Sequence, residues 1–112
     1  MKLSNKNALA LLLDLNQDVE EYAEATVKNI IEDKNFKVLY PPNNGLTESE
    51  KQELAKLDNN DHLKIALRKI IADNSAGIIF NMLNLLDGTG SPKHMYNEWT
   101  GVKLIDEEQN EK

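Results

Sequence analysis

The stretch 62–88 holds the densest apolar material in the chain and limits the folds that the rest can adopt. At about 100° per residue, the apolar side chains of its first half fall on one narrow helical stripe. Residues 78–86 form a much wider apolar arc, whose polar gap is made by Asn81 and Asn84. Because so apolar a segment has to be covered by other elements, the stretch predicts the central part of a helical domain.

The polar gap of the second half falls where the apolar stripe of the first half lies, so a straight helix has to change its buried side near residues 73–75. Asp73, Asn74 and Ser75 are good N-cap residues, and Gly77 follows them. We therefore predict two helices, 61–73 and 75–87, with one kinked helix as the alternative. Gly88 is expected to adopt the left-handed conformation that often follows a helix.

Three further helices are predicted by periodicity and capping signals. Apolar residues recur at steps of three and four over 6–34, which gives the longest helix. Thr47 and Glu50 form a capping box that starts a short helix over 48–57, and Asn60 or Asp61 is expected to cap the helix that follows. Ser91 followed by Pro92 predicts a last helix of one or two turns. The fold class is thus mainly α, a small helical bundle of four to five helices.

Two short segments, 36–40 and 101–105, have β-like character and are the candidates for a minor two-stranded β element. Pro41 and Pro42 exclude a helix and a central strand after the first segment, so an extended connector is the alternative there. We expect residues 1–105 to form a single helical domain. Residues 106–112 are too polar to offset the entropy of ordering, and they predict a disordered acidic tail.

The composition limits the compartment and the partners. A chain of 112 residues with 40% hydrophobic residues suits one domain. Its net charge of −6 opposes binding to nucleic acid or to an anionic membrane. Asp14 makes the apolar run after Ala8 too short for a signal peptide, and no run approaches the roughly 18 residues of a membrane span. Because cysteine is absent, a reducing compartment fits, and we expect a cytoplasmic protein.

No catalytic or metal-binding motif is found. The serines lack a Gly-x-Ser-x-Gly context, a thiol is absent, and residues 88–90 lack the phosphate-loop pattern. Residues 58–62 offer oxygen ligands, but Leu63 and Lys69 stand where a calcium loop needs glycine and glutamate. The two histidines are far apart in sequence and have no partner at zinc-site spacing. We therefore expect a protein that is not an enzyme and that uses no cofactor and no metal.

Two groups of residues are candidates for partner binding. The first helix carries acidic residues that share one surface, namely Asp14, Asp18, Glu21 and Glu24. Such a strip is more often a solvated face, but it would also dock a basic protein surface. Tyr96 and Trp99 form the second group, because these residue types often anchor interfaces; the alternative is that they clamp the C-terminal segment onto the helices.

These observations favour a non-enzymatic protein-interaction module, which means an inhibitor, an immunity-type protein or a regulatory or adaptor subunit. In general character the chain resembles bacterial immunity, antitoxin and adaptor proteins, although no motif carries this resemblance and it assigns no residue a role. The expected partner is another protein with a basic surface. The competing hypothesis is a helical small-ligand binder with a groove near Asn81, Met82 and Asn84. The long stripe over 6–34 leaves a homodimer and a monomer as alternatives.

Overall fold

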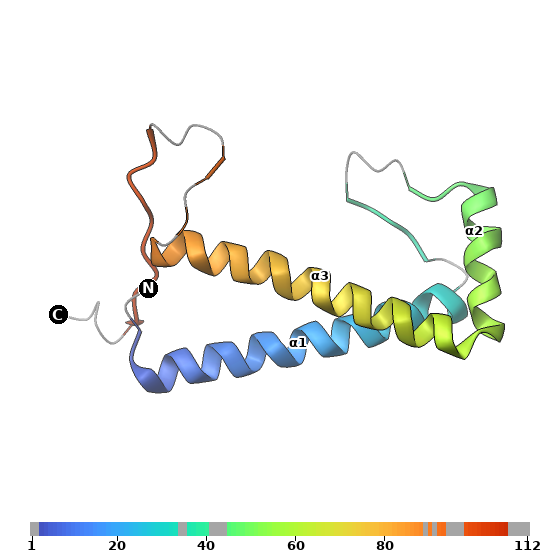
Figure 1. Ribbon diagram of the computed structural model, residues 1–112, viewed down its shortest axis with the longest axis horizontal. Coiled ribbons are helices and arrows are strands. Elements are labelled where there is room, and N and C mark those ends of the chain that lie inside the picture. Colours follow the sequence, from blue (N-terminus) through green and yellow to red (C-terminus); the bar gives the residue numbers. More distant parts are fainter. Residues whose placement is uncertain are drawn as a thin grey trace. The chain divides into compact units, whose positions relative to one another are not determined.

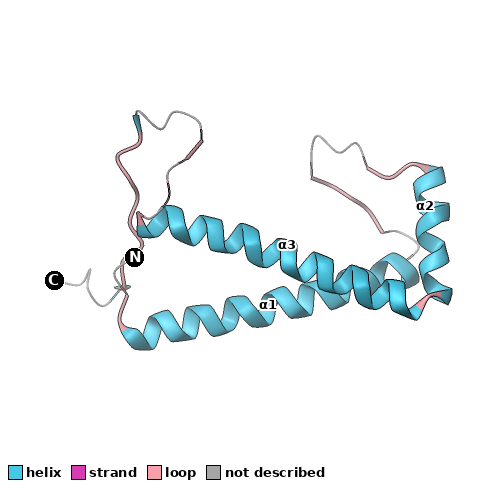
Figure 2. Cartoon of the chain, in the orientation of Figure 1, coloured by secondary structure: helices cyan, strands magenta, loops and turns pink. Residues whose placement is uncertain are grey.

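The computed structural model describes residues 3–33, 36–40, 45–88, 90, 92–93 and 98–107 (Figure 1). In this part of the chain the elements are helices, and no strand is present (Figure 2). They are, in chain order, α1 (Asn5–Glu32), α2 (Glu48–Ala55), the 3-10 helix η1 (Lys56–Asn59) and α3 (Asp61–Asp87). The mainly α fold class is confirmed. The predicted number of four to five helices is wrong for the described residues, which form three α-helices and one short 3-10 helix.

Helix α1 is started by a serine cap. The Ser4 hydroxyl accepts the backbone N–H of Asn7 at 3.2 Å, and the Ser4 carbonyl oxygen accepts that of Ala8 at 2.9 Å. Serine is favoured here because the first amides of a helix have no partner within the helix. Ala23 and Val27, two members of the predicted apolar stripe, are buried. The helix therefore covers nearly the whole predicted range and buries part of its predicted face.

The predicted capping box of α2 is confirmed. The Glu50 backbone N–H donates to the Thr47 hydroxyl at 3.1 Å, and the Thr47 backbone N–H donates to Glu50 Oε1 at 2.8 Å. The α-helical part ends at Ala55, and the chain then tightens into η1. That tighter turn carries Leu57, which is only 4% exposed. The short helix predicted over 48–57 is thus present, with its last turn in 3-10 geometry.

The stretch 61–87 forms one helix, so the prediction of two helices is wrong. The less exposed residues of α3 include a row with steps of three or four positions that winds slowly around the helix: Leu67, Ile71, Ser75, Ile79, Leu83 and Leu86. The buried side therefore shifts gradually and shows no abrupt change near residue 74. Instead, the surplus apolar residues Ile78, Phe80 and Met82 stay exposed.

A break in α3 is not needed for energetic reasons either. Gly77 within a helix costs about 1 kcal/mol relative to alanine. Ending one helix and starting another there would leave up to four amides and four carbonyls without helical partners. Gly88, by contrast, has a φ of +79°, which confirms the predicted left-handed residue after the helix.

The prediction of a β element is wrong as well. Residues 36–40 and 101–105 do not form a two-stranded element; both are irregular, with a single isolated bridge residue at Ile105. Phe36 still belongs to the turn after α1, because its N–H donates to the Asp33 carbonyl at 3.1 Å. Asp106, where the disordered tail was predicted to begin, is buried and hydrogen-bonded. Residues 108–112 and most of the helix predicted after Ser91 lie outside the described residues.

The chain divides into two compact units, whose boundaries fall inside the two long helices. The central unit, Glu20–Asp73, contains the C-terminal part of α1, then α2 and η1, and the N-terminal part of α3. Among its described residues, the buried apolar ones are Ala23, Val27, Leu57 and Ala72. The terminal unit comprises Met1–Val19 and Asn74–Lys112. Among its described residues, Leu83 is the buried apolar one.

Candidate partner-binding groove

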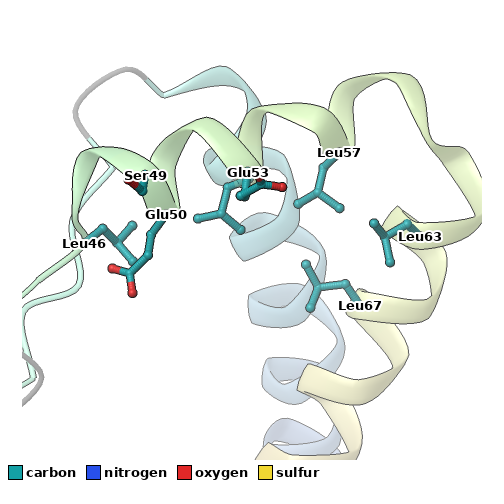
Figure 3. A pocket seen from close by; sticks show the side chains of 8 residues that line it. Leu46, Ser49, Glu50, Glu53, Leu57, Leu63 and Leu67 are labelled. Carbon is teal, nitrogen blue, oxygen red and sulfur yellow. The ribbon is translucent and has the colours of Figure 1, made fainter.

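The central unit contains an open groove with a volume of about 580 Å³. Its walls come from α2 and η1 on one side and from the first turns of α3 on the other (Figure 3). Five leucines supply most of the lining, together with one serine and two glutamates: Leu46, Leu54, Leu57, Leu63, Leu67, Ser49, Glu50 and Glu53. Figure 3 shows Leu57, Leu63 and Leu67 turned toward one another at one end of the groove.

Two helix caps set the positions of the leucines. The capping box at Thr47 fixes the start of α2, and with it the direction in which Leu54 leaves the helix. At the other wall, the Asn60 side-chain oxygen accepts the Leu63 backbone N–H at 3.0 Å, as the prediction of an Asn60 or Asp61 cap required. Each cap satisfies amides that a helix leaves unpaired, so the turn between the two walls is well defined.

The two carboxylates at the groove are held by neighbouring groups. Glu50 Oε1 accepts the Thr47 backbone N–H in the capping box. Glu53 is braced by Lys56, whose Nζ lies 2.9 and 2.8 Å from the two carboxylate oxygens. These interactions are exposed and contribute little to stability. Their effect is to limit the rotamers of both glutamates. Lys56 offsets the charge of Glu53, so the negative charge next to the leucines comes mainly from Glu50.

The chemistry that this lining offers is apolar contact with a few acceptors beside it. One hydroxyl and two carboxylates line the groove, and the rest of the lining consists of leucine side chains. Of these leucines Leu63 has the most surface left to cover, at 47% exposure, whereas Leu57 is already buried. Covering Leu63 contributes at most about 1.5–3 kcal/mol to an association. The groove is thus suited to an apolar surface that carries hydrogen-bond donors or positive charge at its edge.

A second hollow of about 360 Å³ in the central unit has a mixed charge. Lysine and arginine line it together with three acids: Lys28, Lys64, Arg68, Glu24, Glu32 and Asp58. Arg68 Nη1 lies 3.2 Å from Glu20 Oε2, and Lys64 Nζ lies 3.0 Å from Asp61 Oδ1. Because positive and negative groups balance there, the hollow does not select an ion of either sign.

The predicted acidic strip does not contribute to the leucine groove. Asp14, Glu21 and Glu24 are exposed on α1, and Asp18 is half-buried. The first two positions of the strip belong to the terminal unit and the last two to the central unit. Glu24 lines the mixed-charge hollow. A role of the strip in docking stays a prediction.

The other predicted site residues are also separate from the groove. Trp99 is half-buried in the terminal unit, and Tyr96 lies outside the described residues. Asn81, Met82 and Asn84 are exposed on α3. The Asn84 carbonyl accepts the Gly90 N–H at 3.2 Å, so this residue helps to end the helix. The groove that was predicted near these three residues is not the one described above.

The leucines of the groove were recognised in the sequence, but not as a site. Leu54 and Leu57 are the chief apolar residues of the short helix over 48–57, which predicts a surface position for that helix. The periodicity places Leu63 and Leu67 on the apolar stripe of the helix that follows. One sequence signal was available: very few residues separate the two predicted helices. A short connection brings the apolar face of the first helix close to the start of the second. Periodicity within each helix does not show how the two faces meet.

Among the described residues, no helix is long and apolar enough to cross a membrane, and no group of three or more acidic, histidine or cysteine side chains is arranged to hold a metal ion. Comparison with known protein families, with curated proteins and with solved structures gives no match.

Proposed function

We propose that this chain is a non-enzymatic protein-interaction module, an inhibitor, immunity-type or adaptor subunit that docks its partner in the leucine-lined groove. The observation that carries this proposal is the groove itself, where an apolar lining is open at the surface and has carboxylates beside it. Interfaces typically combine an apolar centre with a polar rim, and this groove has both.

The competing hypothesis is a small-ligand binder, and volume alone does not separate the two. At about 580 Å³, the groove falls within the range of ligand pockets, roughly 300–1,000 Å³. Ligand pockets, however, enclose most of the ligand and place several polar groups around it to fix its orientation. An open groove with one hydroxyl and two glutamates at its edge has few groups to fix the orientation of a small molecule. A protein surface makes many more contacts, so its orientation does not depend on these few groups.

The net charge of the chain supports a basic partner. With a formal charge of −6, the protein attracts positively charged surfaces over a distance of about a Debye length, roughly 10 Å at moderate salt. The acidic strip of α1 adds to this attraction without touching the groove. In this proposal the groove gives affinity, and the overall charge raises the association rate.

Photo-cross-linking in the native cells tests the proposal. A photo-reactive p-benzoylphenylalanine in place of Ser49 puts the probe at the groove, and the same probe in place of Ile70 is the control. Ile70 is 64% exposed, lies in the same unit and is not part of the lining. We expect a protein adduct from position 49 and none from position 70. Equal adducts from both positions, or a small molecule that co-purifies and is released by Leu63→Gln in native mass spectrometry, would contradict the proposal.

A further inference from the structure

The geometry points to the occupant of the groove, on the basis of the proposed function: an amphipathic α-helix of another protein, with leucine-like residues on one face and lysine or arginine beside them. Three features of the central unit lead to this class of partner. They are the lack of a free strand edge among the described residues, the length of the wall formed by α2 and η1, and the charge at the edge of the groove.

The backbone N–H and C=O groups of an extended peptide would find few hydrogen-bond partners in this groove. Within the described residues of the central unit no strand offers a free edge, so the backbone of a bound strand would find no ladder. The lining consists mainly of leucine side chains, which do not pair backbone amides or carbonyls. Each unpaired buried backbone group would weaken binding, because it loses its hydrogen bond to water without gaining another. A helix pairs these groups internally and presents side chains alone.

The wall has a length that suits a few helical turns. At the usual rises of 1.5 and 2.0 Å per residue, α2 and η1 together extend for about 20 Å. A helix laid along this wall contacts it through three to four turns, which is roughly 13 residues. Such a helix places apolar anchors at positions i, i+3 or i+4, and i+7 against the leucines.

The charge at the groove favours basic residues beside the apolar face of the bound helix. Glu50 and Glu53 line the groove, none of its lining residues is basic, and Lys56 beside it pairs with Glu53. In the capping box Glu50 accepts the Thr47 backbone N–H through Oε1. A lysine or arginine next to the apolar face of the partner would meet the carboxylate of Glu50 and would compete with Lys56 for that of Glu53. A second copy of this chain is a poor occupant, because it brings a net charge of −6 against −6.

Two designed peptides test this inference against the full chain. Each has about 14 residues and the same leucine face, and the flanking positions are lysine in one peptide and glutamate in the other. We expect fluorescence anisotropy at low salt to show binding of the lysine peptide at least about ten-fold tighter than that of the glutamate peptide. Added salt should reduce the difference, because exposed charges are screened.

Three variants connect the binding to the groove. Leu63→Gln should abolish binding of the lysine peptide, whereas Ile70→Gln, the exposed control on the same helix, should leave it unchanged. The double variant Glu50→Gln with Glu53→Gln should remove the preference for lysine. It keeps the fold, because glutamine also completes a capping box. Circular dichroism of each variant separates loss of binding from loss of structure.

The outcomes that overturn the inference are distinct from failure of the proposed function. Equal binding of the two peptides, or equal binding of a proline-containing version that does not form a helix, overturns it. A concentration-dependent dimer that Leu63→Gln dissociates in sedimentation equilibrium also overturns it and assigns the groove to a second copy. If neither peptide binds while cross-links from position 49 persist, the helical occupant is wrong and the interaction module stands.

Discussion

Among the described residues, one charged side chain is buried: that of Asp106, which is 3% exposed. Its Oδ2 accepts the Ser4 backbone N–H at 3.2 Å and the Asn7 side-chain amide at 2.6 Å. Both donors lie in the first turn of α1 or just before it, where the helix dipole favours a negative charge. One carboxylate therefore holds the C-terminal segment to the start of the first helix, within the terminal unit.

Replacing Asp106 by alanine should lower the free energy of unfolding by about 1–2 kcal/mol, because the change removes charge-assisted hydrogen bonds and leaves two partly buried donors without this acceptor. Glu107→Gln is the matched control, since the neighbouring residue is exposed, and it should change stability by less than about 0.5 kcal/mol. Urea unfolding followed by circular dichroism measures both. Equal effects of the two substitutions would show that Asp106 does not hold the segment.

At the scale of the element, α3 contains in its middle several residues of the types that usually begin or end helices. Asn74, Ser75 and Gly77 lie in its middle, and the helix continues through them to Asp87. The helix ends where Gly88 adopts a positive φ. Composition alone does not distinguish these positions, because a glycine ends a helix only where the following chain leaves the helical direction.

Alanine in place of Gly77, within α3, and alanine in place of Gly88, directly after α3, should change the free energy of unfolding in opposite directions. Gly77→Ala should raise the free energy of unfolding by about 0.5–1 kcal/mol, because alanine loses less entropy in a helix and the added Cβ meets nothing within 4 Å. Gly88→Ala should lower it by about 1–2 kcal/mol, because the φ of +79° is strained for alanine although the space is open. Thermal and urea unfolding of both variants provide the check. A loss of stability in Gly77→Ala would indicate a break in the helix near that residue.

At the scale of the molecule, negative charge and exposed apolar surface occur together. Large apolar residues are exposed on both long helices, for example Leu13 on α1 and Phe80 on α3. Single exposed apolar residues are common in soluble proteins, so they do not define a site by themselves. The groove differs because its leucines converge on one space. The net charge of −6 opposes association of copies through the remaining apolar residues.

The acidic strip of α1 should act through this long-range field. Replacing Asp14, Asp18, Glu21 and Glu24 by asparagine or glutamine should slow association of the lysine peptide by about ten-fold at low salt and leave its dissociation rate almost unchanged. Stopped-flow fluorescence at several salt concentrations measures the two rates, and the melting temperature of the variant checks its fold. An association rate that responds neither to the substitutions nor to salt would identify the strip as a solvated face only.

The sequence by itself determined the features that depend on residues three or four positions apart. The capping box of Thr47 with Glu50, the Asn60 cap and the left-handed Gly88 were all predicted, because each is a bond or a backbone angle within one turn of chain. The helical class was predicted for the same reason, since amphipathic periodicity is local.

Only the tertiary structure decided which apolar side chains are covered and which distant groups meet. Phe80 and Leu83 are equally suited to a core, yet only Leu83 is buried, because burial depends on the surface that faces each side of α3. Asp106 finds Ser4 from more than a hundred positions away, and its polar surroundings in sequence predicted a disordered tail instead. The groove likewise depends on the turn that brings Leu57 to Leu63 and Leu67. Hydrogen bonds within a turn are encoded locally, whereas contacts between elements require the geometry of the folded chain.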